Sequence, residues 1–326
     1  MTLFAAVNIW RWHPHPEVWA LVVGLIGMYA YAIRVIGPTA TQDDEVIVTK
    51  AQVRWFVAAM VTLEVAADWP MHDIGEKYLY SVHMAQHLLL SFVLPPMALL
   101  ATPTWLARLV IGNGRGYRVV RWTTRVVPAT IFFNVVVVFS HWPAVVALSV
   151  KYSWFHYSLH FLVVAVALNM WMGICSPLPE LRFTLLVQAG YLFLQSVVPT
   201  VPAGILVFSE TVAYKSYNHA GRILGMTPIE DQQLAATIMK VVAGTYLWVI
   251  IACLFIRFAT RAQEDDRVRG VQLDRRAPAG AWPEPPSSRP VRYRRPSGPA
   301  DEPTLTWDEV QQQLADAGPA PREPSG

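Results

Sequence analysis

The strongest constraint on the fold is a series of apolar stretches, each long enough to cross a membrane as a helix. About 20 apolar residues in a helix span the roughly 30 Å hydrocarbon layer of a bilayer. Backbone groups inside that layer must pair with one another, which favours helices over open strands. The sequence therefore predicts an all-α membrane protein, a bundle of seven transmembrane helices. The predicted spans run from Val18 to Ile36, Val53 to Trp69, Tyr78 to Leu100, Val126 to Ser140, Trp154 to Ile174, Phe183 to Phe208 and Leu234 to Ile256.

The distribution of Lys and Arg between the loops predicts the orientation of this bundle, because cytoplasmic loops keep an excess of positive charge. The loop from Arg108 to Arg125 holds five arginines and no acid, and the other loops on its side add six basic residues. The loops on the opposite side hold five. We therefore expect the N-terminus outside and the C-terminus in the cytoplasm.

Charge and proline divide the chain into two parts. Residues 263–326 hold 20 of the 49 charged residues and 11 of the 25 prolines. This composition buries too little apolar area to repay ordering, so we predict a seven-span membrane domain over residues 1–262 and a disordered cytoplasmic tail over residues 263–326. Inside the tail, Thr306 and Glu309 have the spacing of a capping box, which predicts a short helix near residues 306–317.

The composition also excludes several classes of protein. With 54% hydrophobic and 15% charged residues, the chain is not an ordinary soluble enzyme. A net charge of +3 without a basic run offers no face for nucleic acid. The two cysteines, Cys175 and Cys253, lack a CxxC partner, which excludes a disulfide framework, a zinc ribbon and a thiolate redox pair. We expect membrane lipid around the chain, no nucleic-acid partner and no small-molecule substrate.

All nine histidines fall on the predicted outer half of the bundle. His83 and His87 are four residues apart, on one face of the third span, about 7 and 13 Å below its outer start. His156 and His160 repeat this spacing at a similar depth in the fifth span. Polar side chains at such depth are costly and usually face a bundle interior or a wet cavity. Two pairs at matched depth therefore predict a shared site.

Imidazole and thioether groups are ligands that suit copper. We expect copper to bind between His83, His87, His156 and His160, with His141 at the end of the fourth span or His72 in the loop after the second span as a further ligand. Other polar or sulfur-bearing residues are candidates to orient these ligands or to form an ion path: Glu64, Asp68, Met84, Gln86 and Asp231. Lys240, deep in the seventh span, needs an acid partner or a wet cavity, and Asp231 or Glu64 are possible partners.

Several motifs carry a resemblance to a known family. They are Tyr78 to His87, Pro95 to Pro103, the pair His156 and His160, Pro177-Leu178-Pro179, and Asp231 to Met239. Together they resemble the CtaG-type cytochrome c oxidase assembly factors, bacterial seven-span membrane proteins, over residues 13 to 258. The chain differs from the usual family pattern at Ala235, Ala236 and Lys240, where glycines and a tryptophan are common.

The resemblance implies a non-enzymatic role in the biogenesis of a haem-copper oxidase in the bacterial plasma membrane, at the stage of copper delivery, with an oxidase subunit as partner. Two other functions remain open at this point. Two spans that offer histidines at one depth can ligate haem, as in a b-type electron carrier. A kinked sixth span with Pro199 and Pro202, together with charged residues in the membrane, also fits a copper or cation transporter.

Overall fold

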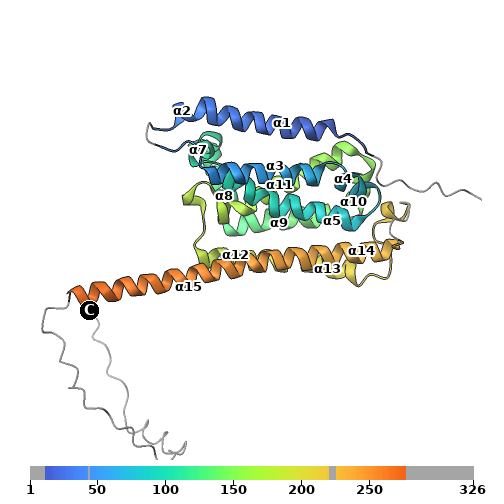
Figure 1. Ribbon diagram of the computed structural model, residues 1–326. Coiled ribbons are helices and arrows are strands. Elements are labelled where there is room, and N and C mark those ends of the chain that lie inside the picture. Colours follow the sequence, from blue (N-terminus) through green and yellow to red (C-terminus); the bar gives the residue numbers. More distant parts are fainter. Residues whose placement is uncertain (1–11, 43–44, 220–224, 277–326) are drawn as a thin grey trace, which may run out of the picture. The chain divides into compact units, whose positions relative to one another are not determined.

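A computed structural model describes residues 12–42, 45–219 and 225–276, and every element in these ranges is helical (Figure 1). The chain divides into two units, Met1–Asp266 and Arg267–Gly326. The helices that carry the candidate site all belong to the first unit. The helix predicted near residues 306–317 lies outside the described residues.

In the described first half of the chain no helix is longer than 18 residues, and several helices continue one another. In order they are α1 (Pro16–Tyr31), η1 (Ala32–Ile36), α2 (Gly37–Ala40), α3 (Lys50–Ala67), α4 (Met71–Lys77), α5 (Tyr80–Leu88), η2 (Leu89–Val93), α6 (Leu94–Ala101), α7 (Thr104–Ile111), α8 (Arg115–Thr123), α9 (Val126–Ser140) and α10 (Pro143–Lys151). The second half comprises α11 (Ser153–Cys175), η3 (Pro179–Leu181), α12 (Leu185–Val197), α13 (Thr200–Val207), η4 (Lys215–His219), α14 (Pro228–Thr237), η5 (Ile238–Val242) and α15 (Ala243–Arg276).

Five helical segments in the described residues are long and apolar enough to span a membrane, namely Pro16–Ala40, Tyr80–Ala101, Ser153–Cys175, Leu185–Val207 and Pro228–Arg269. A sixth is reached if Arg115–Thr123 and Val126–Ser140, bent by 76°, count as one span. Helix α3 has 18 residues, roughly 27 Å of helix, but it carries Lys50, Arg54 and Glu64 and is not among them. The described part of the chain is thus all-α, with five or six helices able to cross a membrane, and the count of seven and the orientation stay predictions.

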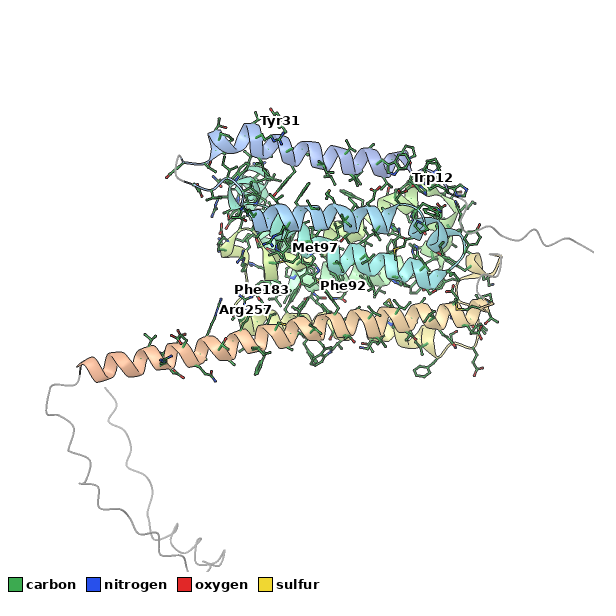
Figure 2. The ribbon with its side chains drawn as sticks, in the orientation of Figure 1. Trp12, Tyr31, Phe92, Met97, Phe183 and Arg257 are labelled. Atoms are coloured by element: carbon green, nitrogen blue, oxygen red, sulfur yellow. The ribbon has the colours of Figure 1, made fainter. Side chains whose placement is uncertain are left out.

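The outer faces of these helices are apolar, as expected for contact with lipid. Tyr31, Met28 and Val23 on α1 are all more than half exposed. Figure 2 shows Tyr31 on the outside of α1, whereas Phe92 and Met97 lie among the helices. Water does not favour so much exposed apolar surface, so this distribution fits a hydrocarbon surrounding.

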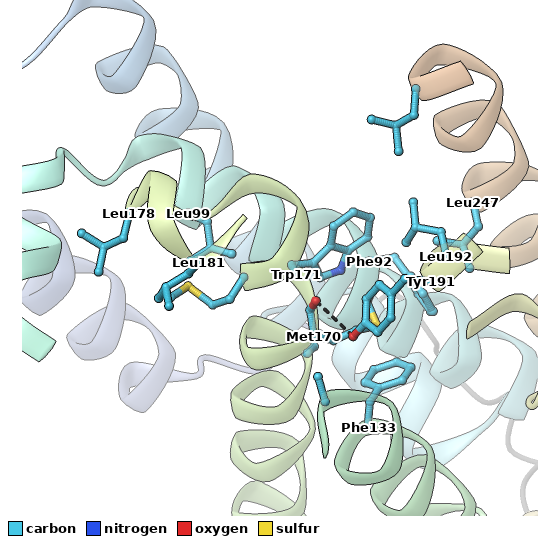
Figure 3. Close-up of a cluster of buried hydrophobic side chains, with 14 of the residues drawn as sticks. Phe92, Leu99, Phe133, Met170, Trp171, Leu178, Leu181, Tyr191, Leu192 and Leu247 are labelled. Atoms are coloured by element: carbon cyan, nitrogen blue, oxygen red, sulfur yellow. Dashed lines mark hydrogen bonds between the residues drawn. The ribbon is translucent and has the colours of Figure 1, made fainter. Parts of the chain in front are cut away.

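A core of large side chains holds the helices together around the C-terminal half of α11. Trp171, Met170 and Phe133 are almost fully buried and meet Leu192 and Tyr191 from α12 (Figure 3). The hydroxyl of Tyr191 donates to the carbonyl of Met170 at 3.3 Å, which is the dashed line in Figure 3. This core fixes α11 against its neighbours and thereby the register of the histidines at its start.

Pro95 and Pro96 loosen the third predicted span and free two carbonyls, because proline cannot donate to the residue four positions earlier. The indole of Trp171 donates to the carbonyl of Ser91 at 3.0 Å. The hydroxyl of Tyr246 donates to the carbonyl of Phe92 at 2.9 Å. Side chains of two neighbouring helices thus satisfy both freed carbonyls.

Helix α15 continues to Arg276, past Gln263, where the sequence predicted the start of the disordered tail. Residues 264–269 place acidic and basic side chains three and four positions apart, a spacing that supports an exposed helix. Local charge pairing therefore explains why a polar segment without a buried face is helical here.

Candidate metal centre

Four histidines from two helices meet at one end of the bundle. Helix α5 supplies His83 and His87, and α11 supplies His156 and His160. The ring centroids of His87 and His160 are 4.8 Å apart, and those of His83 and His160 are 5.7 Å apart. Within each helix the paired rings lie 4.5 Å and 4.3 Å apart. The structure thus brings together the two pairs that the sequence analysis joined.

Three nitrogen atoms in this cluster are buried without a hydrogen-bond partner among the described residues. They are Nδ1 of His83, Nε2 of His156 and Nε2 of His160. Buried polar atoms in folded proteins are nearly always paired, and each exception requires an explanation such as an ion. A cavity of about 10 Å³ lies between these rings, room for a single water or ion.

His83, His87 and His160 each direct one nitrogen toward a common region, and these nitrogens lie within 4.8 Å of one another. Metal–nitrogen bonds of about 2.0–2.1 Å bring ligand atoms to within roughly 4 Å. Small rotations of the rings therefore suffice to complete a three-imidazole site.

His72, which lies on α4, adds a fifth histidine to the cluster. Its ring lies 5.7 Å from that of His156, and its Nε2 is 3.2 Å from a carboxylate oxygen of Glu76. His72, Glu76 and His156 form a second group whose ligand atoms lie within 4.8 Å. The hydrogen bond from His72 holds the pKa of the Glu76 carboxyl below its ordinary value.

Glu76 was absent from the residues that the sequence analysis selected. The signal that could have found it is its position four residues after His72 on the same helix, the spacing that singled out the other pairs. Glu76 was not selected because it lies in a short helix outside the predicted spans.

His141 and Met84 lie beside His87. His141 donates from Nδ1 to the carbonyl of Val137 at 2.7 Å, so its Nε2 carries a lone pair. That Nε2 lies 3.3 Å from the sulfur of Met84, and the His141 ring centroid lies 6.1 Å from that of His87. An imidazole nitrogen and a thioether sulfur thus face each other next to the three-imidazole group.

Asp231 supports the site indirectly, because it holds the start of α5, the helix that carries His83 and His87. Its carboxylate accepts the backbone N–H groups of Tyr80 and Ser81 at 2.7 and 3.0 Å, and the Ser81 hydroxyl at 2.5 Å. A carboxylate here satisfies the free donors at the start of α5 and favours its dipole. Lys240, for which Asp231 was a candidate partner, donates instead to the hydroxyl of Thr200 and the carbonyl of Ser196.

Glu64 and Asp68 face α1 rather than the imidazoles. Asp68 accepts a hydrogen bond from the indole of Trp19 at 2.9 Å. Glu64 lines a separate, mainly apolar cavity of about 560 Å³ formed by α1 and α3. The structure therefore places these two acids apart from the candidate ligands.

The N-terminal arm reaches the site through Asp73. His15 Nε2 lies 3.1 Å from an Asp73 oxygen, and Lys77 pairs with the other oxygen. Burial acts to raise the pKa of Asp73, but the hydrogen bonds from Lys77 and His15 hold it below its ordinary value. The His15 ring meets that of His72 edge-on at 5.1 Å, while His13 remains partly exposed. The side chain of His219 lies outside the described residues.

Comparison with known proteins identifies a family. The family model described as cytochrome c oxidase caa3 assembly factor (Caa3_CtaG) matches residues 27–261. No curated protein and no solved structure matches the chain.

Proposed function

The chain belongs to the family of cytochrome c oxidase caa3 assembly factors, and from this we propose that it binds copper in the histidine cluster and helps to deliver it to a haem-copper oxidase. Copper is here a cargo that a partner takes up. The predicted orientation places the cluster on the extracytoplasmic side of the plasma membrane. There the exchange with an oxidase subunit takes place.

The observation that supports copper binding most directly is the set of three unpaired, buried imidazole nitrogens around a cavity of ionic size. A cation coordinated by these lone pairs removes their desolvation cost. Imidazole suits several transition metals, whereas the thioether of Met84 beside His141 favours copper, in particular its reduced ion.

The test is metal analysis of protein purified in mild detergent from copper-supplemented cells, with any affinity tag removed. In the double variant His83→Asn, His87→Asn, the copper content should fall, since asparagine keeps a polar group but is a poor copper ligand. His13→Asn is the control, because its side chain is 44% exposed and does not line the cavity. An unchanged copper content in the double variant would overturn the assignment of the site.

The size of the cavity argues against a b-type haem. A haem needs a slot for the whole macrocycle between its two axial histidines. The cavity among the imidazoles measures about 10 Å³, and the neighbouring one lined by His87, His141 and Lys240 about 50 Å³. We expect a visible spectrum without a Soret band, and a stoichiometric Soret band would revive the haem alternative.

The position of Lys240 argues against a transporter. Its side chain lines the cavity next to His87 and His141, and a positive charge there repels a cation that moves beyond the cluster. We expect proteoliposomes to bind copper without accumulating it in their lumen. Copper-dependent uptake that disappears in the histidine double variant would favour transport.

A further inference from the structure

We propose that the histidine cluster contains two metal sites in series, an outer site of His72, Glu76 and His156 and an inner site of His83, His87 and His160. The copper ion binds first at the outer site and then passes to the inner one. This inference rests on the proposed function but goes beyond it, because it assigns Glu76 as a ligand, sets the number of ions at two and gives them an order.

The outer site has the features of a built metal site. His72 and His156 are 4% and 3% exposed, and the side chain of Glu76 is 24% exposed. His156, a member of this group, has its Nε2 buried without a hydrogen-bond partner among the described residues. Two imidazoles and a carboxylate form a donor set typical of divalent transition metals.

Gln86 supports the outer site from behind. Its side-chain amide lies 3.2 Å from Nδ1 of His72, and its carbonyl oxygen is buried without a partner among the described residues. Exchange of the two amide atoms, which have almost the same shape, lets the carbonyl accept the Nδ1–H of His72. With the ring proton on Nδ1, an ion bound between Nε2 of His72 and the Glu76 carboxylate replaces the hydrogen bond that joins these two groups in the metal-free chain. Histidine ligands commonly have their second nitrogen fixed in this way.

The inner site has softer donors. It consists of three imidazoles, and the pair of His141 Nε2 and Met84 Sδ lies beside its member His87. The outer site, by contrast, contains a carboxylate. Carboxylate oxygen favours hard cations and thioether sulfur favours reduced copper, so the donor set becomes softer from the outer to the inner site.

Contacts between rings connect the two sites. His156 lies 5.8 Å from His83 and 4.3 Å from His160, centroid to centroid, so a ligand of the outer site touches two ligands of the inner one. The ion can therefore move by exchange of one metal–nitrogen bond for another. The exchange changes no oxidation state and needs no further reactant.

The experiment counts ions per chain by native mass spectrometry of the full-length protein, titrated with copper(II) sulfate and desalted. We expect two ions in the unaltered chain, one in Glu76→Gln, one in the variant His83→Asn, His87→Asn, and none when all three changes are combined. Glu180→Gln is the matched control, because Glu180 also forms an ion pair, with Arg108, but follows the opposite end of α11.

A single ion in the unaltered chain, or two ions in Glu76→Gln, would overturn the two-site arrangement. Copper that is absent from every variant, including the unaltered chain, would instead overturn the proposed function itself. If Glu76→Gln does not fold, Glu76→Asp keeps the charge and shortens the reach, and we expect at least tenfold weaker binding of one of the two ions. Equal affinities in Glu76→Asp and the unaltered chain would then exclude Glu76 as a ligand.

Discussion

Gln86 is a residue whose chemistry matters through its neighbour. It is 1% exposed and contacts the nitrogen of His72 that points away from Glu76. Replacement of such a supporting hydrogen bond typically weakens metal binding by about 10- to 100-fold. We therefore expect Gln86→Leu to lower the affinity of the outer site for copper by this factor in a titration. Gln86→Glu keeps an acceptor and should retain most of that affinity.

The control for Gln86 is another buried glutamine with a structural role. Gln188 donates to the carbonyl of Phe183 at 2.9 Å in a different part of the bundle. Gln188→Leu should lower the melting temperature but leave both copper affinities unchanged. If Gln188→Leu lowers the copper affinity as much as Gln86→Leu does, general destabilisation rather than ligand orientation explains both effects.

Asp231 gives a second test at the residue scale. Asp231→Ala leaves two backbone N–H groups and a hydroxyl at the start of α5 without their acceptor, which should cost about 1–3 kcal/mol of stability. Thermal unfolding in detergent measures this cost, and Asp231→Asn should recover part of it because it keeps one acceptor oxygen. Equal melting temperatures for Asp231→Ala and the exposed-site control Glu45→Ala would contradict the capping role.

At the scale of whole helices, the third predicted span depends on distant partners for its proline-freed carbonyls. Tyr246→Phe removes only the hydroxyl that donates to Phe92, and we expect a loss of about 1 kcal/mol in unfolding free energy. Tyr117→Phe is the matched control, because Tyr117 packs at the edge of the same core without a hydrogen bond in the described structure. Identical stabilities of the two variants would show that the Tyr246 hydroxyl contributes nothing.

The same helix shows what could and could not be predicted from sequence. Pro95 and Pro96 were sufficient to predict the free carbonyls, because the effect of proline is local. The donors lie 80 and 154 residues away, a relation that only the packed fold establishes. The histidine pairs on α5 and α11 followed from helical periodicity. Their division into two groups depends on His72 and Glu76, which α4 brings next to His156 in the packed fold.

At the scale of the whole molecule, the orientation in the membrane is open to a direct test. In a background with Cys175→Ser and Cys253→Ser, single cysteines can be placed at Glu210 and Asn113, in loops predicted to lie on opposite sides. A membrane-impermeant maleimide should label Glu210→Cys in intact cells and Asn113→Cys only after permeabilisation. The reverse pattern would place the histidine cluster on the cytoplasmic side and remove the predicted route to an extracytoplasmic partner.

The unpaired nitrogens of His83, His156 and His160 also link the stability of the bundle to its cargo. Each buried group without a partner costs the protein roughly 1–3 kcal/mol, and a coordinated cation removes that cost. Anything that binds only the folded chain stabilises it by mass action. The protein should therefore be most stable with copper bound and least stable just after it has released the ion. The amount of folded protein in the membrane should then depend on the copper supply.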